Sequence, residues 1–272
     1  MKYGCCSNML ACGEVLVKSN FIGMLAACGY DYIELSVVDC IRLTPADRLE
    51  LKKRLDGTGL RAEVFNSLFP RELKTTGPDV DPKRVQDWYM QALELASSFG
   101  AKYVVYGSPY SKSYPLGYDR ARAYEQLLLL HRAMDEYAGQ LEMSILIEPC
   151  HRLECNLINT FAEGVELAKC VAGKNTAVIF DYYHFLRNAE RLDALIQYGR
   201  QYLKHIHFAC PFHPGEPERT FPLDAREWDY EPLRSAVQDI GYNDRISIEA
   251  VCMDLGAQAA RALCVTKELF GQ

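Results

Sequence analysis

The feature that most constrains the fold of this chain is a regular alternation of short apolar segments with longer segments of helical periodicity. The short segments are strand-like and lie at residues 2–7, 30–37, 61–69, 102–107, 143–149, 177–183, 203–209 and 245–251. Such alternation is typical of a parallel sheet, because parallel neighbours need a crossover helix between them. The sequence therefore predicts an α/β fold built from eight strand–helix units.

Eight units favour a closed barrel over an open sheet. The helical segments are expected near residues 15–28, 45–56, 89–99, 160–171, 189–202, 230–240 and 258–270, with a further long helix that follows the loop at 108–118 and ends near residue 138. Thr44 before Pro45 is typical of a helix start, with a capping hydroxyl followed by proline in the first turn. The first strand–helix turn lacks the glycines of a dinucleotide-binding loop. We predict a single-domain (β/α)8 TIM barrel spanning residues 1–272.

Charge and cysteine content narrow the class of protein. The chain has 30 basic and 36 acidic residues, a net charge of −6, which disfavours nucleic-acid binding. We expect neither an export signal nor a membrane segment, since no apolar run is long enough for either. The 11 cysteines are scattered and form no CxxC pair, so we predict free thiols and a cytoplasmic location.

Ionisable residues stand at the ends of the last four predicted strands. These are Glu148, Asp181, His207 and Glu249, each within an otherwise apolar segment. The carboxyl ends of barrel strands meet at one mouth, where barrel chemistry is found. Three carboxylates and an imidazole converging there call for a divalent cation, since unpaired buried charges are costly. His205 lies one layer deeper than His207 and is expected to pack against it or support it.

A plainer interpretation exists for each residue alone. A carboxylate after a strand is more often a helix cap or a solvated loop residue. Four such residues at matching places in consecutive units favour the metal site. An oxygen-rich donor set with one imidazole suits Mn²⁺, Mg²⁺ or Co²⁺ better than a structural Zn²⁺. We expect one divalent ion, with Mn²⁺ as first choice and Mg²⁺, Co²⁺ or Zn²⁺ as alternatives.

The same residues carry a resemblance to a known family. The segment EPCHRLE at 148–154, the DYYH at 181–184, the HIH at 205–207 and the SIE at 247–249 resemble motifs of xylose isomerase-like barrels, in particular the ketose 3-epimerases. The resemblance implies metal ligands at Glu148, Asp181, His207 and Glu249. It also implies sugar contacts from Glu154 and His184, and a homodimer or homotetramer.

The remaining site residues are less clearly marked. In the epimerases an arginine closely follows the second histidine of the HxH motif. Here that histidine is His207, and the nearest arginine is Arg219, twelve residues later. Arg219 either contacts the sugar or is an ordinary surface arginine. Glu34, Asn66 and Gly107 end the second, third and fourth predicted strands and are expected to line the mouth, with Asn66 and Gly107 contacting substrate.

These residues predict a metal-dependent isomerase acting on a free monosaccharide or polyol-derived substrate. Glu148 and Glu249 are the proposed base and acid for C3 epimerisation through a metal-stabilised enediolate. Aldose–ketose isomerisation, inosose isomerase or dehydratase activity and hydroxypyruvate isomerase activity remain open on the same ligands. An endonuclease IV-like repair enzyme would need additional histidine ligands from the third and fourth strands, where Asn66 and Gly107 stand. A non-catalytic subunit of a carbohydrate-processing complex is the remaining alternative.

Overall fold

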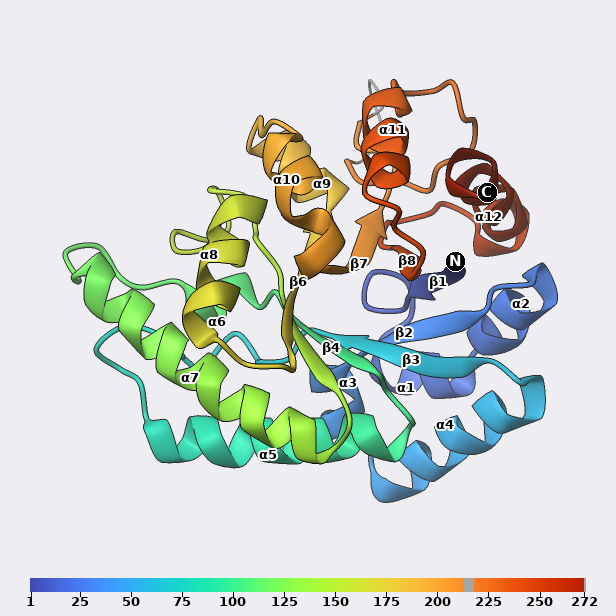
Figure 1. Cartoon of the computed structure of the whole chain (residues 1–272). Coiled ribbons are helices and arrows are strands. Elements are labelled where there is room, and N and C mark those ends of the chain that lie inside the picture. The colour runs from blue at the N-terminus through green and yellow to red at the C-terminus, as the bar shows by residue number, and fades with distance from the viewer. Residues whose placement is uncertain (213–217, 272) are drawn as a thin grey trace.

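Eight parallel strands close into a barrel in sequence order, as predicted (Figure 1). The computed structural model describes residues 1–212 and 218–271. Closure comes from β1 pairing with β8, with Gly4 opposite Ser247. The strands are β1 Lys2–Cys6, β2 Tyr32–Ser36, β3 Arg61–Asn66, β4 Tyr103–Tyr106, β5 Ser144–Ile147, β6 Thr176–Asp181, β7 Leu203–Phe208 and β8 Arg245–Ile248.

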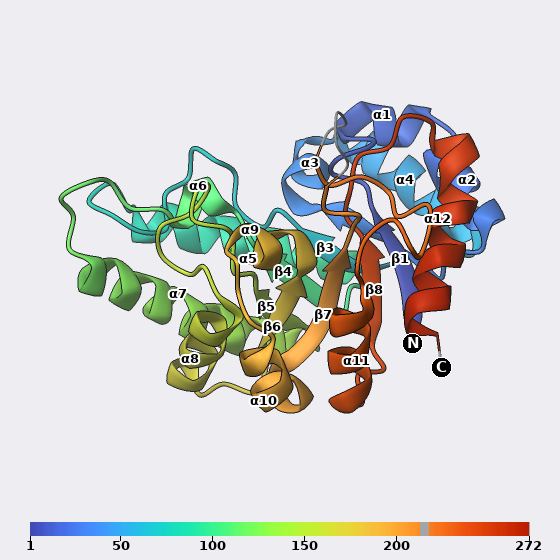
Figure 2. The same cartoon turned by 90° about the horizontal axis from the view of Figure 1, so that it is seen from above.

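The helices surround the strands, as the view turned by 90° from Figure 1 shows (Figure 2). They are α1 Gly13–Lys18, α2 Phe21–Cys28, α3 Val37–Arg42, α4 Pro45–Thr58, α5 Pro82–Ser98, α6 Pro109–Lys112, α7 Arg120–Gln140, α8 Phe161–Val171, α9 Tyr182–Arg187, α10 Asp193–Tyr202, α11 Glu231–Asp239 and α12 Leu255–Phe270. Because α12 packs against β1 and α2, the two ends of the chain lie side by side.

Local sequence explains where several helices begin. The Thr44 side chain accepts a hydrogen bond from the backbone N–H of Asp47, and Pro45 occupies the first turn of α4, as predicted. Helix α8 begins with a reciprocal capping box between Thr160 and Glu163. Asp81 caps α5, which therefore begins seven residues before the predicted 89–99 segment.

The structure divides one predicted helix and shortens another. The segment 15–28 is α1 and α2, separated at Ser19 where the backbone becomes extended, with φ −83° and ψ 171°. The segment 189–202 starts too early, because Ala189 adopts a left-handed backbone with φ 50° after α9. The short helices α3, α6 and α9 were not predicted, since each has six residues or fewer and no full apolar period.

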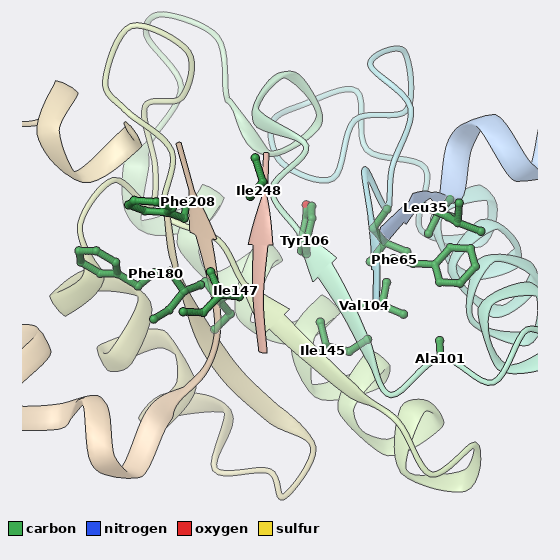
Figure 3. Close-up of a cluster of buried hydrophobic side chains, with 14 of the residues drawn as sticks. Leu35, Phe65, Ala101, Val104, Tyr106, Ile145, Ile147, Phe180, Phe208 and Ile248 are labelled. Atoms are coloured by element: carbon green, nitrogen blue, oxygen red, sulfur yellow. The ribbon is translucent and has the colours of Figure 1, made fainter. Parts of the chain in front are cut away.

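Apolar packing lies on both sides of the barrel wall. Outward-facing strand residues such as Leu35, Phe65 and Val104 pack under the helices (Figure 3). A smaller interior cluster fills the barrel itself, formed by Tyr32, Val64, Val105, Leu146, Ala177 and Ile179. All 11 cysteines are free, and no helix of the described residues is long and apolar enough to cross a membrane.

Candidate active site

Two successive layers of inward-facing residues lie at the mouth end of the barrel, since successive side chains on a strand alternate between its faces. The lower layer comprises Gly4, Tyr32, Val64, Val105, Leu146, Ile179, His205 and Ser247. Two residues further along each strand lies what we call the upper ring, comprising Cys6, Glu34, Asn66, Gly107, Glu148, Asp181, His207 and Glu249. The lower layer is largely apolar, whereas the upper ring carries the charges.

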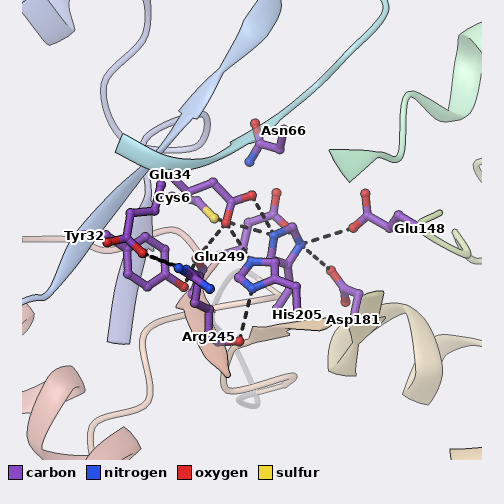
Figure 4. Close-up of polar contacts among 12 residues, drawn as sticks. Cys6, Tyr32, Glu34, Asn66, Glu148, Asp181, His205, Arg245 and Glu249 are labelled. Atoms are coloured by element: carbon purple, nitrogen blue, oxygen red, sulfur yellow. Dashed lines mark hydrogen bonds and ion pairs between the residues drawn. The ribbon is translucent and has the colours of Figure 1, made fainter. Parts of the chain in front are cut away.

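The structure brings the four predicted metal ligands together. Glu148, Asp181, His207 and Glu249 are all buried, and one ligand atom from each lies within 4.8 Å of the others. The Nδ1 atom of His207 is 3.2 Å from Glu148 Oε1, 3.5 Å from Asp181 Oδ2 and 2.9 Å from Glu249 Oε2. Figure 4 shows Glu148 and Asp181 turned toward the same imidazole. We call these four residues the quartet.

Burial and mutual charge shape the ionisation of the quartet. Burial raises the pKa of Asp181, but the charges of Arg219, His184 and His207 outweigh it and hold that pKa well below its ordinary range. The bond to His207 likewise lowers the pKa of Glu148 against the effect of burial. Both carboxylates are therefore ionised at neutral pH, which is the form that binds a cation.

Gly107 leaves the space that the Glu148 carboxylate occupies. A Cβ atom built on Gly107 would lie 1.9 Å from Glu148 Oε2, so a side chain at this position would displace the carboxylate. Asn66, at the end of β3, is buried, and its Nδ2 has no hydrogen-bond partner among the described residues. An unpaired buried amide of this kind has hydrogen-bonding capacity for a ligand.

The structure adds two supporting residues that the sequence did not mark, and it gives Glu34 a different place from the one expected. Glu34 lies behind His207 rather than lining the mouth, with Oε1 2.8 Å from His207 Nε2. Asn8 donates from Nδ2 to Glu249 Oε1 at 2.8 Å, and Lys112 donates from Nζ to the Glu148 carbonyl at 2.5 Å. Glu34 carried a usable signal, a charge inside the apolar strand YIELS. Asn8 and Lys112 lie in loops or short helices, where polar residues are unremarkable.

A second group lies beside the quartet and contains the predicted sugar contacts. The backbone N–H of His184 donates to Asp181 Oδ1 at 2.9 Å, which ties this residue to the quartet. His151 contacts both of these residues, Glu154 and His184. Its Nε2 is 3.1 Å from Glu154 Oε1, and its backbone N–H donates to His184 Nδ1 at 3.3 Å. Burial lowers the pKa of His184. Glu154 is 38% exposed in its side chain and is thus the accessible member of the group.

Comparison with known proteins places this architecture in a family. The family model described as xylose isomerase-like TIM barrel matches residues 22–269. The chain belongs to this family. Its curated relatives include a D-psicose 3-epimerase of Ruminiclostridium cellulolyticum, 25% identical over 236 residues, which cover 84% of this chain and 76% of the relative. An inosose isomerase of Bacillus velezensis is 23% identical over 248 residues, covering 86% and 84%.

A solved structure agrees with the fold over the whole chain. The structure of D-psicose 3-epimerase with D-tagatose from Clostridium cellulolyticum H10 has a TM-score of 0.80 and 22% identity, covering 99% of both chains. The relatives of this xylose isomerase-like barrel are thus named as epimerases and isomerases.

Arg219 is the point at which this family member departs from the epimerase pattern in sequence. In space it reaches the quartet: its guanidinium hydrogen-bonds the carboxylates of Asp181 and Glu249, and its Nε donates to the Glu249 carbonyl at 2.7 Å. Thr220 anchors the loop by bridging Cys210 on one side and Val251 on the other. Arg219 therefore lies at the mouth of the barrel, although it is twelve residues from His207 in the sequence.

Proposed function

We propose that this protein is a divalent-metal-dependent sugar epimerase that inverts a free ketose at C3. The observation that carries the proposal is the pair Glu148 and Glu249. Their carboxylates come from β5 and β8 and approach the same imidazole atom at 3.2 and 2.9 Å. Two carboxylates that face one point from different strands supply a base that removes a proton from a carbon and an acid that returns one to it.

The residues present fit a divalent cation. Three buried carboxylates and one imidazole nitrogen form a compact, oxygen-rich donor set, which suits Mn²⁺, Mg²⁺ or Co²⁺ and also accommodates Zn²⁺. Glu148, Asp181, His207 and Glu249 would hold the ion. A bound ion would supply Lewis-acid stabilisation of the negative charge that develops on the ketose oxygens. We take Mn²⁺ as the first choice.

The protein's own residues then divide the work. Glu148 takes the C3 proton, and Glu249 delivers a proton to the opposite face, giving the C3 epimer. The reverse reaction exchanges the two roles. Asn8, bonded to Glu249, and Lys112, bonded to the Glu148 main chain, hold these carboxylates in place.

The sugar hydroxyls require polar partners around the reacting carbon. Glu154 and His184 supply them on one side, held by His151. Arg219 supplies a cation beside Asp181 and Glu249, and Asn66 supplies an unpaired amide from the opposite wall. Gly107 contributes space rather than a contact. The single domain spanning 1–272, the homodimer or homotetramer and the cytoplasmic location remain predictions.

Inosose isomerase activity is the second candidate, favoured by the Bacillus velezensis relative. Both reactions move a proton next to a carbonyl, so the quartet alone does not separate them. The separating residues are the sugar contacts, because an inosose is a ring without the terminal hydroxymethyl group of a ketose.

The test is a screen of Mn²⁺-loaded protein against free ketoses, ketose phosphates and inososes, followed by chromatography. We expect epimers of a free ketose, and in D₂O one deuterium at C3. Deuterium at C1 of the recovered ketose, or at C2 of an aldose product, would instead indicate aldose–ketose isomerisation. Turnover of inososes without any ketose turnover would contradict the proposal and establish the second candidate.

A further inference from the structure

Glu34 is a carboxylate fully enclosed in the barrel, and the proton-transfer scheme does not use it. Its side chain has no exposed surface and lies in the upper ring at the end of β2. Burying a charged group without partners costs several kcal/mol, on the order of a whole domain's net stability. Such a group is retained only where its partners or its role require it.

The partners of Glu34 are arranged around both of its oxygens. Oε1 faces His207 Nε2 at 2.8 Å, while Oε2 faces His205 Nε2 at 2.9 Å and accepts the Ser247 hydroxyl at 2.6 Å. Ser247 in turn is 2.9 Å from the Tyr32 hydroxyl. His205 is itself held, with Nδ1 3.1 Å from the Arg245 carbonyl. The carboxylate therefore has one orientation.

This arrangement decides how His207 is presented to the quartet. An imidazole whose Nε2 donates to a carboxylate carries its proton on Nε2 and leaves Nδ1 with a free lone pair. The Nδ1 atom is the one that lies within 3.5 Å of Glu148, Asp181 and Glu249. A carboxylate behind a metal-binding histidine orients the ring and strengthens it as a ligand.

We propose that Glu34 is a positioning residue that makes Nδ1 the metal-binding atom of His207 and sets the affinity of the site for its divalent ion. The proposal rests on the metal site of the proposed function, but not on its substrate. The competing role is structural: Glu34 would then serve only as a counter-charge for His205 and His207 during folding. The two roles differ in whether metal affinity changes in a folded variant.

The principal experiment measures Mn²⁺ binding to Glu34→Gln by electron paramagnetic resonance of the free ion, beside a thermal melt. Glutamine keeps the size of the side chain and removes its charge. We expect the Kd for Mn²⁺ to rise about 10- to 100-fold, the range seen for such supporting groups. A folded variant whose Kd lies within about twofold of the wild type, a change well inside that range, overturns the proposal.

Glu63→Gln is the matched control. Glu63 lies on β3 at the other end of the barrel, where it bonds Lys2 and Arg245 at 2.6 Å each. Losing this charge should lower the melting temperature and leave the Kd for Mn²⁺ unchanged. An equal loss of Mn²⁺ affinity in both variants would show a general effect of buried charge and count against Glu34.

A measurement on the wild-type protein avoids dependence on the variant's folding. In zinc-loaded protein with ¹⁵N-labelled histidine, the His207 ring should show a metal-bound Nδ1 and a protonated Nε2. A metal-bound Nε2 overturns the proposal. Absence of sugar turnover with this nitrogen pattern intact would contradict the proposed function alone, and so the two failures are distinguishable.

Discussion

The two halves of the barrel contribute differently to the upper ring. Strands β5 to β8 supply the quartet, with every one of its four positions bearing a group that could bind a metal ion. Strands β1 to β4 supply a thiol, a carboxylate, an amide and a glycine, from Cys6, Glu34, Asn66 and Gly107. The carboxylate bonds His207, and the glycine makes room for Glu148. One half holds the donors, and the other orients them and leaves space.

This difference shows how a symmetric fold makes an asymmetric site. All eight strands end at the same mouth, but the four residues of the quartet come from four consecutive strands. The opposite half can then contact the far side of these residues, as Glu34 contacts Nε2 of His207, or it can face the substrate. Substitutions in the two halves should therefore fail in different ways.

The largest effect is expected in the donor half. Glu249→Gln removes a donor oxygen and a proton carrier while preserving size, so kcat should fall by about 10³-fold. The measurement is ketose epimerisation at saturating Mn²⁺, with the melting temperature as the check on folding. Full epimerase activity in this variant would remove Glu249 from the mechanism.

A steric change in the other half should be nearly as damaging. Gly107→Ala places a methyl group 1.9 Å from Glu148 Oε2, so the carboxylate must move. We expect kcat/KM to fall about 10- to 100-fold, as for other changes that displace a metal ligand. Gly57→Ala is the matched control, because a Cβ on Gly57 would have no atom within 4 Å. Equal activities of the two variants would contradict the role assigned to Gly107.

A smaller effect separates sugar binding from metal binding. His151→Leu leaves Glu154 without its partner at 3.1 Å, so KM for the ketose should rise about tenfold while Mn²⁺ affinity stays constant. His151→Gln retains a donor of similar reach and should restore most of the loss. A change in Mn²⁺ affinity without a change in KM would assign His151 to the quartet instead.

The last prediction concerns stability and not activity. Burial raises the pKa of Glu190 from 4.5 to about 7, beside the start of α8, where it accepts from the Phe161 N–H. The folded state thus favours the protonated acid, and this stabilisation is complete below pH 4.5 and is lost as the pH rises through about 7. Between pH 5 and 8 the wild type should lose about 1–3 kcal/mol relative to Glu190→Gln. The measurement is the free energy of unfolding in urea at each pH. The same pH dependence in the two proteins would contradict this prediction.

The sequence determined the architecture and predicted the four residues of the quartet. Eight apolar segments in alternation with helices sufficed for the closed barrel, because the alternation of secondary structure is a local property. Glu148, Asp181, His207 and Glu249 were visible because a charge in an apolar strand is costly without a partner. The break at Ser19 and the late start of α10 after Ala189 were not visible, because they depend on single backbone conformations and not on periodicity.

Only the tertiary structure decided what surrounds the donors. Glu34 and His207 are 173 residues apart, and the contact between them exists only because β2 and β7 lie in one closed ring. Arg219 was ambiguous along the chain and reaches Asp181 only through the loop anchored at Thr220. The type of side chain at each strand end can be read from the local sequence pattern. The distances between side chains on opposite strands are set only when the barrel closes. Closure is therefore what turned four separate strand ends and their supports into one site.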